Sequence, residues 1–188
     1  YASGAGVIFG STGGVMEAAL RTVYEMLTGE ELEQVEFPEV RSEEYKDAEI
    51  QMGQYRLKAA VARGTGEARR LIEAVLKGEK EYHFVEVMAC PAGCVGGGGQ
   101  PIYIETNDWN EQVAHRSRRA GGLYEQDRRK EFRKSHTNPS VIKLYQDFLG
   151  HPGSDLARQL LHTSYVSRKL YAPEPLPRKE HKQKVQPL

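Results

Sequence analysis

The chain has 188 residues, enough for one medium domain with a buried core or for part of a larger one. Its 26 Lys and Arg residues balance 26 Asp and Glu residues, so composition favours neither a nucleic acid nor an acidic membrane face as a partner. No apolar run approaches the roughly 20 residues that span a bilayer, and no basic signal-peptide segment opens the chain, so we expect a cytoplasmic protein without a membrane span.

The chain opens in a glycine-rich stretch, GAGVIFGSTGG at residues 4–14. Its short apolar run at 7–9 predicts a strand or extended loop that leads into a helix. Apolar residues then recur at helical spacing, at Met16, Leu20, Val23 and Leu27. Gly29 predicts the end of this helix. Because the chain starts inside this stretch and without a methionine, we expect it to belong to a longer polypeptide.

The middle of the chain predicts strands and one helix. Apolar residues between 50 and 61 predict two short strands that form a hairpin around Gly53. Residues 67–77 have helical spacing and end at Gly78, and residues 83–87 (HFVEV) predict another strand. A segment with both cysteines follows that strand, where α/β proteins tend to bind ligands.

The rest of the chain, from residue 107, is polar and predicts helices. Asn138 and Pro139 have the form of an N-cap followed by proline at the first helical position, and Ser154 predicts the cap of one more helix. The first of these helices has an apolar face, made by Val141, Leu144, Tyr145, Phe148 and Leu149. The expected fold class is α/β, with a mixed sheet flanked by helices and followed by C-terminal helices.

The first glycine-rich stretch departs from the known nucleotide-binding fingerprints. A dinucleotide fingerprint that begins at Gly4 and Gly6 needs glycine at position 9, where Phe9 stands, and no Gly-Lys-Ser/Thr follows for a P-loop. We therefore expect these glycines to permit close packing at a turn into the helix, with a non-phosphate cofactor as the alternative.

Cys90 and Cys94 are the two cysteines of the chain, and four glycines at 96–99 follow them. Thiolates are soft ligands that select zinc, copper(I) and iron-sulfur clusters. A zinc site needs two further ligands, usually a second close pair, and His83 and the other histidines are scattered. Two buried structural cysteines are the other alternative, but they leave the glycines unexplained, whereas a backbone passing close to a bulky cofactor accounts for them.

Three stretches carry a family resemblance. VMACPAGCVGGGGQP, preceded by YHFVE, closely resembles the third cysteine motif of the FeFe hydrogenases. GAGVIFGSTGGVMEAALRTVYEMLTG is similar to their glycine-rich segment, and KSHTNPSVIKLYQDFLGHPGSDLARQLLH to their C-terminal helices. The resemblance implies that residues 1–165 are the C-terminal half of a two-lobed catalytic domain that holds the H-cluster. The end of the chain is rich in proline and lysine, so we expect residues 166–188 to form an extended or disordered tail.

The resemblance also implies a cofactor and site residues. Cys90 is expected to be a terminal ligand of a 4Fe-4S cluster. Cys94 is expected to bind that cluster and to bridge it to a two-iron subcluster with CO, cyanide and dithiolate ligands, at the catalytic position. Met88, Phe9 and Gly10 are expected to line the pocket of the two-iron unit, where protons and hydrogen are interconverted.

The family's four-cysteine cluster site is only half present here. Its other two cysteines, its cyanide-contacting lysine and its usual proton path belong to upstream motifs, so the upstream half of the catalytic domain is an expected partner. We therefore assign no general acid or base, and expect solvated or structural roles for Glu17 and Glu86. Ala92 stands where many members have glycine.

Two functional classes remain open at this stage. The first is an iron hydrogenase, an oxidoreductase linked to ferredoxin or to NADH-dependent subunits. The second is a non-catalytic relative, either an iron-sulfur assembly scaffold without the two-iron unit or a hydrogen sensor.

Overall fold

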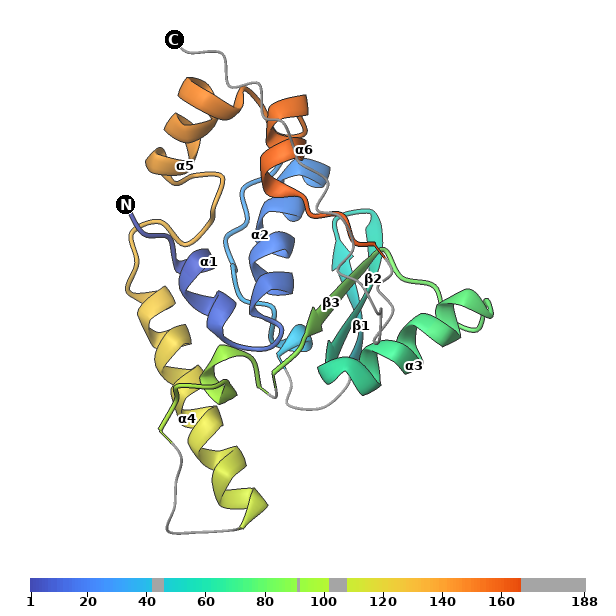
Figure 1. Ribbon diagram of the computed structural model, residues 1–188. Coiled ribbons are helices and arrows are strands. Elements are labelled where there is room, and N and C mark those ends of the chain that lie inside the picture. The colour runs from blue at the N-terminus through green and yellow to red at the C-terminus, as the bar shows by residue number, and fades with distance from the viewer. Residues whose placement is uncertain (42–45, 91, 102–107, 167–188) are drawn as a thin grey trace, which may run out of the picture.

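The computed structural model describes residues 1–41, 46–90, 92–101 and 108–166, and its centre is a three-stranded sheet. The strands β1 (Lys46–Met52), β2 (Tyr55–Arg63) and β3 (Phe84–Met88) lie side by side in that order. Helix α2 (Gly14–Thr28) covers one face and α3 (Gly64–Leu76) the other (Figure 1). These layers confirm the α/β class.

The sheet is mixed, as the sequence predicts. β1 and β2 form an antiparallel hairpin in which Met52 pairs with Tyr55, and Gly53 takes a left-handed φ of 56° in the turn. β2 and β3 are parallel, so the chain crosses over through α3 between them. β2 is therefore the central strand, and its residues 59–62 are buried because both faces are covered.

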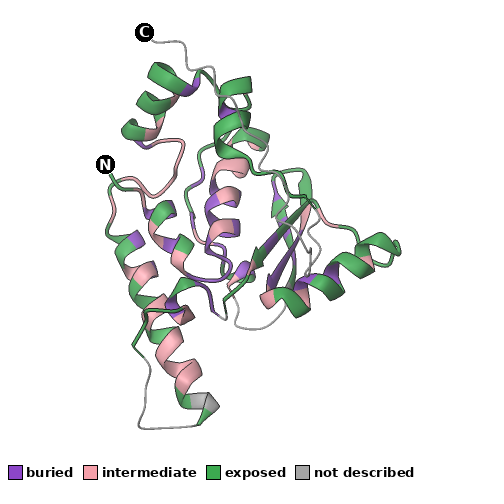
Figure 2. Cartoon of the chain, in the orientation of Figure 1, coloured by how far each residue is buried: buried purple, intermediate pink, exposed green. Residues whose placement is uncertain are grey.

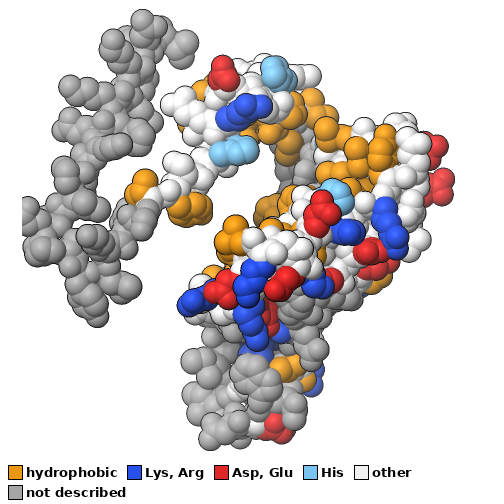
Figure 3. Space-filling model, turned by 90° about the vertical axis from the view of Figure 1, so that its right-hand side faces the viewer, with side chains coloured by type: hydrophobic (Ala, Val, Ile, Leu, Met, Phe, Trp, Pro, Cys, Tyr) orange, Lys and Arg blue, Asp and Glu red, His pale blue; other side chains and the backbone are white. Residues whose placement is uncertain are grey.

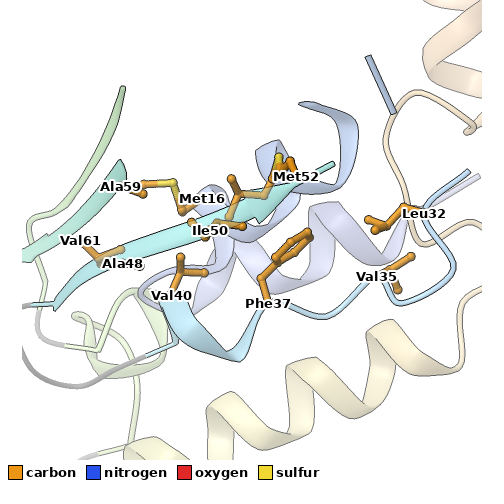
Figure 4. Close-up of a cluster of buried hydrophobic side chains, with 11 residues drawn as sticks. Met16, Leu32, Val35, Phe37, Val40, Ala48, Ile50, Met52, Ala59 and Val61 are labelled. Atoms are coloured by element: carbon orange, nitrogen blue, oxygen red, sulfur yellow. The ribbon is translucent and has the colours of Figure 1, made fainter. Parts of the chain in front are cut away.

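The main core lies between α2 and the sheet (Figure 4). Met16 and Leu20 of α2 pack there against the hairpin and against the segment that follows the helix. The buried members are Met16, Leu20, Leu32, Val35, Phe37, Val40, Ala48, Ile50, Met52, Ala59 and Val61. On the opposite face a smaller cluster joins Ala60 and Ala62 to Ala68 and Leu71 of α3.

The predicted strand or extended loop at residues 7–9 is wrong, because this run is helical. It forms the end of α1 (Gly4–Val7) and a 3₁₀ turn at Ile8–Gly10. Ser3 caps α1 by accepting from the Gly6 N–H at 3.2 Å. The run is too short for a period to be read from it, and its conformation is set by contacts with residues more than 100 positions away.

Those distant contacts come from the second half of the chain. The Gly4 and Ala5 N–H groups donate to the carbonyls of Phe132 and Arg133 at 2.7 and 3.0 Å. Ile8 is buried in a cluster with Tyr124 of α4 (Trp109–Arg128). Figure 1 shows α1 lying between α4 and α2. A Cβ at Gly4 would lie 1.9 Å from Asp127 Oδ1, which confirms close packing as a role of these glycines.

Several predicted helix ends are confirmed by backbone geometry. Gly29 ends α2 in the left-handed conformation, with φ of 71°, and Gly78 has φ of 72° just after α3. α3 begins at Gly64, three residues earlier than the periodicity indicates, because the Glu67 carboxylate accepts from the Arg63 N–H at 2.8 Å.

The last helices are capped as predicted but are largely exposed. Asn138 caps α5 (Pro139–Leu144), which runs into a π-helical turn at Tyr145–Leu149, and Ser154 caps α6 (Asp155–Leu161). In the expected apolar face only Leu149 is buried, whereas Phe148 is 59% exposed. Figures 2 and 3 show this exposed, partly apolar surface in the upper part of the molecule.

The predicted tail at 166–188 lies, apart from Val166, outside the described residues. Within the described ranges no helix is long and apolar enough to cross a membrane.

Candidate functional site

The two cysteines lie on successive tight turns just after β3. The Gly93 N–H donates to the Cys90 carbonyl at 3.0 Å, and the Gly97 N–H donates to the Cys94 carbonyl at 3.1 Å. Both thiols are free, and both cysteines are exposed. The segment therefore presents two soft donors at the surface, where further ligands can reach them.

The backbone between the cysteines has an unusual conformation. Ala92 has φ of 61°, which is the one positive value at a non-glycine position among the described residues, and Gly93 has φ of 85°. This explains why glycine suits position 92. A Cβ at Gly93 would lie 2.8 Å from the Gly10 carbonyl oxygen and 2.9 Å from the Thr12 nitrogen, so only glycine fits there.

The glycine-rich loop packs directly against the cysteine segment. The Thr12 N–H donates to the Ala92 carbonyl at 3.1 Å, and the 3₁₀ turn Ile8–Gly10 packs on the 3₁₀ turn Cys94–Gly96. The fold therefore brings the turn that contains Phe9 and Gly10 against the turn that begins at Cys94, although the two turns are about half the chain apart in sequence.

A buried carboxylate connects the same loop to β3. Glu86 is 5% exposed, and its two oxygens accept from the Gly13 and Met16 N–H groups, each at 2.7 Å. Burial raises the pKa of Glu86, although the two backbone donors oppose this effect.

Helix α4 holds the other side of the cysteine segment. Arg119 donates to the Val95 carbonyl at 3.0 Å and to the Pro101 carbonyl at 2.7 Å. This residue was not identified from the sequence, because nothing in its spacing distinguishes it from the neighbouring Arg116 and Arg118.

A buried ionic network fixes α4 to α2. Its members are Glu17, Arg21, Glu36, Arg41, Asp127 and Arg133. All five N–H groups of Arg21 are used, and Arg21, Glu17 and Asp127 are each 0% exposed. Burial opposes the charge on Arg21, but Asp127 and Glu17 outweigh it and raise its pKa.

The residues expected to line the pocket are partly exposed or closely packed. Phe9 is 46% exposed, and Met88 is half-buried at the end of β3. A Cβ at Gly10 would lie 2.7 Å from Leu123 Cδ1 of α4, so close packing contributes to the need for glycine there. Glu17 and Glu86 are structural rather than solvated, since both are buried and hydrogen-bonded.

The two cysteine thiols lack further metal ligands beside them within the described part of the chain. Among the described residues no group of three or more His, Cys, Asp and Glu side chains could hold a metal ion. This leaves the zinc alternative without its further ligands within the described ranges. Gly97 lies beside Cys90, with its Cβ position 3.6 Å from Sγ, whereas Gly98 and Gly99 face open space. The clearance role of these glycines stays a prediction.

Comparison with protein families gives two matches. The iron-only hydrogenase large subunit, C-terminal domain, matches residues 1–98, and the iron hydrogenase small subunit matches residues 113–168. The first match covers α1 to the cysteine segment, and the second covers most of α4 with α5 and α6.

Individual relatives agree with these matches. The NADP-reducing hydrogenase subunit HndD of Solidesulfovibrio fructosivorans is 48% identical over 89% of this chain, which spans 28% of that relative. The solved FeFe-hydrogenase HydA1 from Chlamydomonas reinhardtii is 40% identical, with a TM-score of 0.63, over 84% of this chain and 45% of that chain. Protein NAR1 of Arabidopsis thaliana is 31% identical over 84% of this chain and 33% of its own length.

The cysteine turns, the glycine-rich loop packed on them and the helices around them thus lie within the matched regions. The chain belongs to the iron-only hydrogenase large-subunit family, and it corresponds to the C-terminal part of the FeFe hydrogenases.

Proposed function

We propose that this chain provides half of the H-cluster site of an FeFe hydrogenase that interconverts protons and hydrogen. The observation that carries the proposal is the pair of exposed thiols on successive turns, packed against the glycine-rich loop, in a chain 48% identical to a hydrogenase subunit.

The donor set fits the proposed cofactor as half of a four-thiolate site. Cys90 would bind a 4Fe-4S cluster, and Cys94 would bind it and bridge to the two-iron unit, with the other two cysteines supplied by the upstream half of the domain. When bound, the two-iron unit would supply the site at which two protons and two electrons are converted reversibly to hydrogen. Thiolates suit this duty because soft ligands select iron-sulfur clusters over hard cations.

The other residues of the chain would shape the pocket. Phe9, Gly10 and Met88 would line it, and an aromatic ring and a thioether provide an apolar wall with few competing ligands. The packing of the Ile8–Gly10 turn on the Cys94–Gly96 turn supports this assignment. We further propose ferredoxin or NAD(P)H-linked subunits as electron partners, which the similarity to the NADP-reducing hydrogenase subunit supports.

Iron-sulfur assembly without hydrogen chemistry is the second candidate. It is favoured by the 31% identity to Protein NAR1 and by the 32% identity to the mouse cytosolic iron-sulfur assembly component 3. The higher identity to HndD favours the hydrogenase.

Iron analysis and infrared spectroscopy of the complete polypeptide that carries this segment separate the two candidates. The hydrogenase proposal predicts absorption bands from metal-bound CO and cyanide together with cluster iron. Cluster iron without these bands would contradict it and support the assembly function.

A further inference from the structure

The N-terminus of α2 receives its cap from a distant part of the chain. Gly13 occupies the N-cap position with φ of 85° and has no side chain to accept from the first N–H groups. Thr12 precedes it, but its hydroxyl is buried and has no hydrogen-bond partner among the described residues. The Glu86 carboxylate, 73 positions later than Gly13, accepts from Gly13 and Met16 instead.

This cap spans the two segments that form the site. Glu86 lies on β3, four residues before Cys90, and Gly13, whose N–H it accepts from, lies three residues after Gly10 in the glycine-rich loop. On the other side of Cys90, the Ala92 carbonyl accepts from the Thr12 N–H. Hydrogen bonds therefore join the glycine-rich loop to the cysteine segment on both sides of the first cysteine.

Strand geometry extends the effect toward the pocket. Side chains two residues apart on a strand project from the same face, so Glu86 and Met88 share the face of β3 that looks toward the loop. A carboxylate with one oxygen on each of two N–H groups holds both the distance and the angle between strand and helix. Two bonds of 2.7 Å in a buried position leave little freedom.

We propose that Glu86 is a positioning residue, which fixes the register of the cysteine segment against the glycine-rich loop and thereby the place of Cys94 relative to Phe9. The proposal rests on the proposed function, because it assigns Glu86 to the geometry of the pocket that would hold the two-iron unit. Glu86 itself touches neither thiol in this role, and acts through the backbone of residues 10–16.

The substitution Glu86→Gln tests this role with little change in volume. The amide has one carbonyl oxygen, so it can accept from one of the two N–H groups, while its own NH₂ group faces the other. We expect amide hydrogen exchange in the peptide 11–17 of the complete polypeptide to rise roughly tenfold or more, because a buried donor is left unpaired. We also expect the CO and cyanide bands of the bound cofactor to shift or broaden.

Glu25→Gln provides the matched control. Glu25 lies near the C-terminal end of α2, opposite the end that Glu86 caps, and accepts from the Leu32 N–H at 2.9 Å and from Lys134 at 2.5 Å. Its loss lowers stability through the same chemistry, but it should leave exchange at 11–17 and the infrared bands unchanged. If Glu86 only capped the helix and did not position the pocket, the infrared bands would be unchanged in both variants.

The outcomes separate this inference from the proposed function. Band positions and widths in Glu86→Gln equal to those of the unsubstituted protein would overturn the inference. Absence of CO and cyanide bands from the unsubstituted protein would overturn the proposed function instead. If those bands are absent, amide exchange at 11–17 in Glu86→Gln still tests whether Glu86 holds the glycine-rich loop. Unchanged exchange would overturn that contact as well, and increased exchange would support it.

Discussion

The buried ionic network and the cysteine segment differ in how their polar groups are satisfied. Arg21, Glu17 and Asp127 are excluded from solvent and pair with one another and with neighbouring carbonyls. Cys90 and Cys94 are exposed on tight turns, and neither thiol forms a disulfide. Stability and the proposed chemistry therefore depend on different parts of the chain, and we expect substitutions in one part to leave the other largely unaffected.

The largest effect on stability is expected for Arg21→Lys. Lysine keeps the charge but has three donors in place of five, so at least two of the hydrogen bonds that Arg21 makes to Glu17, Asp127 and the backbone would be lost. We expect the free energy of unfolding in urea to fall by about 3 to 5 kcal/mol, because each lost hydrogen bond to a charged group costs roughly 1.5 to 3 kcal/mol. A loss below about 1 kcal/mol would mean that the network contributes no more than a surface ion pair.

A smaller loss is expected for Arg119→Ala, which removes the contact between α4 and the cysteine segment. Two carbonyl groups, of Val95 and Pro101, lose their charged donor, and we expect a cost of about 1 to 2 kcal/mol. Amide exchange at Gly96 and Gly97 should increase. Arg118→Ala, an exposed position on the same helix, is the control, with an expected change within about 0.5 kcal/mol. Equal effects of the two substitutions would contradict this role of Arg119.

Acid should weaken the contact of Glu25, near the C-terminal end of α2, with Lys134 and His136. Burial disfavours ionisation of Glu25, but hydrogen bonds from Lys134, the Leu32 N–H and His136 outweigh it and lower its pKa from 4.5 to about 2. The unfolded state therefore takes up the proton first as the pH falls below about 4.5, and this contribution to stability is lost as the pH approaches about 2.

Denaturation curves between pH 7 and pH 2 measure that contribution. At pH 7, Glu25→Gln should lower the free energy of unfolding by roughly 1 kcal/mol, and the gap from the unsubstituted protein should close as the pH falls. A gap that stays constant down to pH 2 would exclude ionisation of Glu25 as the cause.

The smallest effect is expected for Ala92→Gly. The left-handed backbone costs a non-glycine residue about 1 to 2 kcal/mol, and the greater freedom of glycine in the unfolded chain offsets about 0.4 to 1 kcal/mol. We therefore expect a gain of about 0.5 kcal/mol, measured by thermal unfolding. Destabilisation would indicate that the buried Cβ of Ala92 contributes more packing than its φ of 61° costs.

Much of the fold could be predicted because its signals are local. The turn at Gly53, the helix end at Gly29 and the caps at Asn138 and Ser154 each depend on a few neighbouring residues. The prediction of a strand or extended loop at 7–9 was wrong because the conformation there depends on carbonyl groups at 132 and 133. The ionic network was not predicted, since its charges lie between residues 17 and 133 and have no shared spacing.

In the candidate site, too, the local motif could be predicted and the contacts between distant segments could not. Cys90, Cys94 and the glycines were identified because a compact motif carries them, and the left-handed Ala92 gives a reason for the glycine found there in the family. The roles of Glu86 and Arg119 could not be predicted, because both act on backbone groups of distant segments. A single charged residue on a strand or a helix carries no sign of such a partner.

Substitution of Cys94 tests the central claim most directly. In the complete polypeptide free of its clusters, Cys94→Ser should leave the free energy of unfolding within about 0.5 kcal/mol, because it changes one atom of a side chain that forms no disulfide. A hydroxyl is a harder and poorer bridge than a thiolate, so the infrared bands of metal-bound CO and cyanide should disappear. Bands of unchanged intensity, together with full hydrogen turnover, would contradict the assignment of Cys94 as the bridge to the reacting metals.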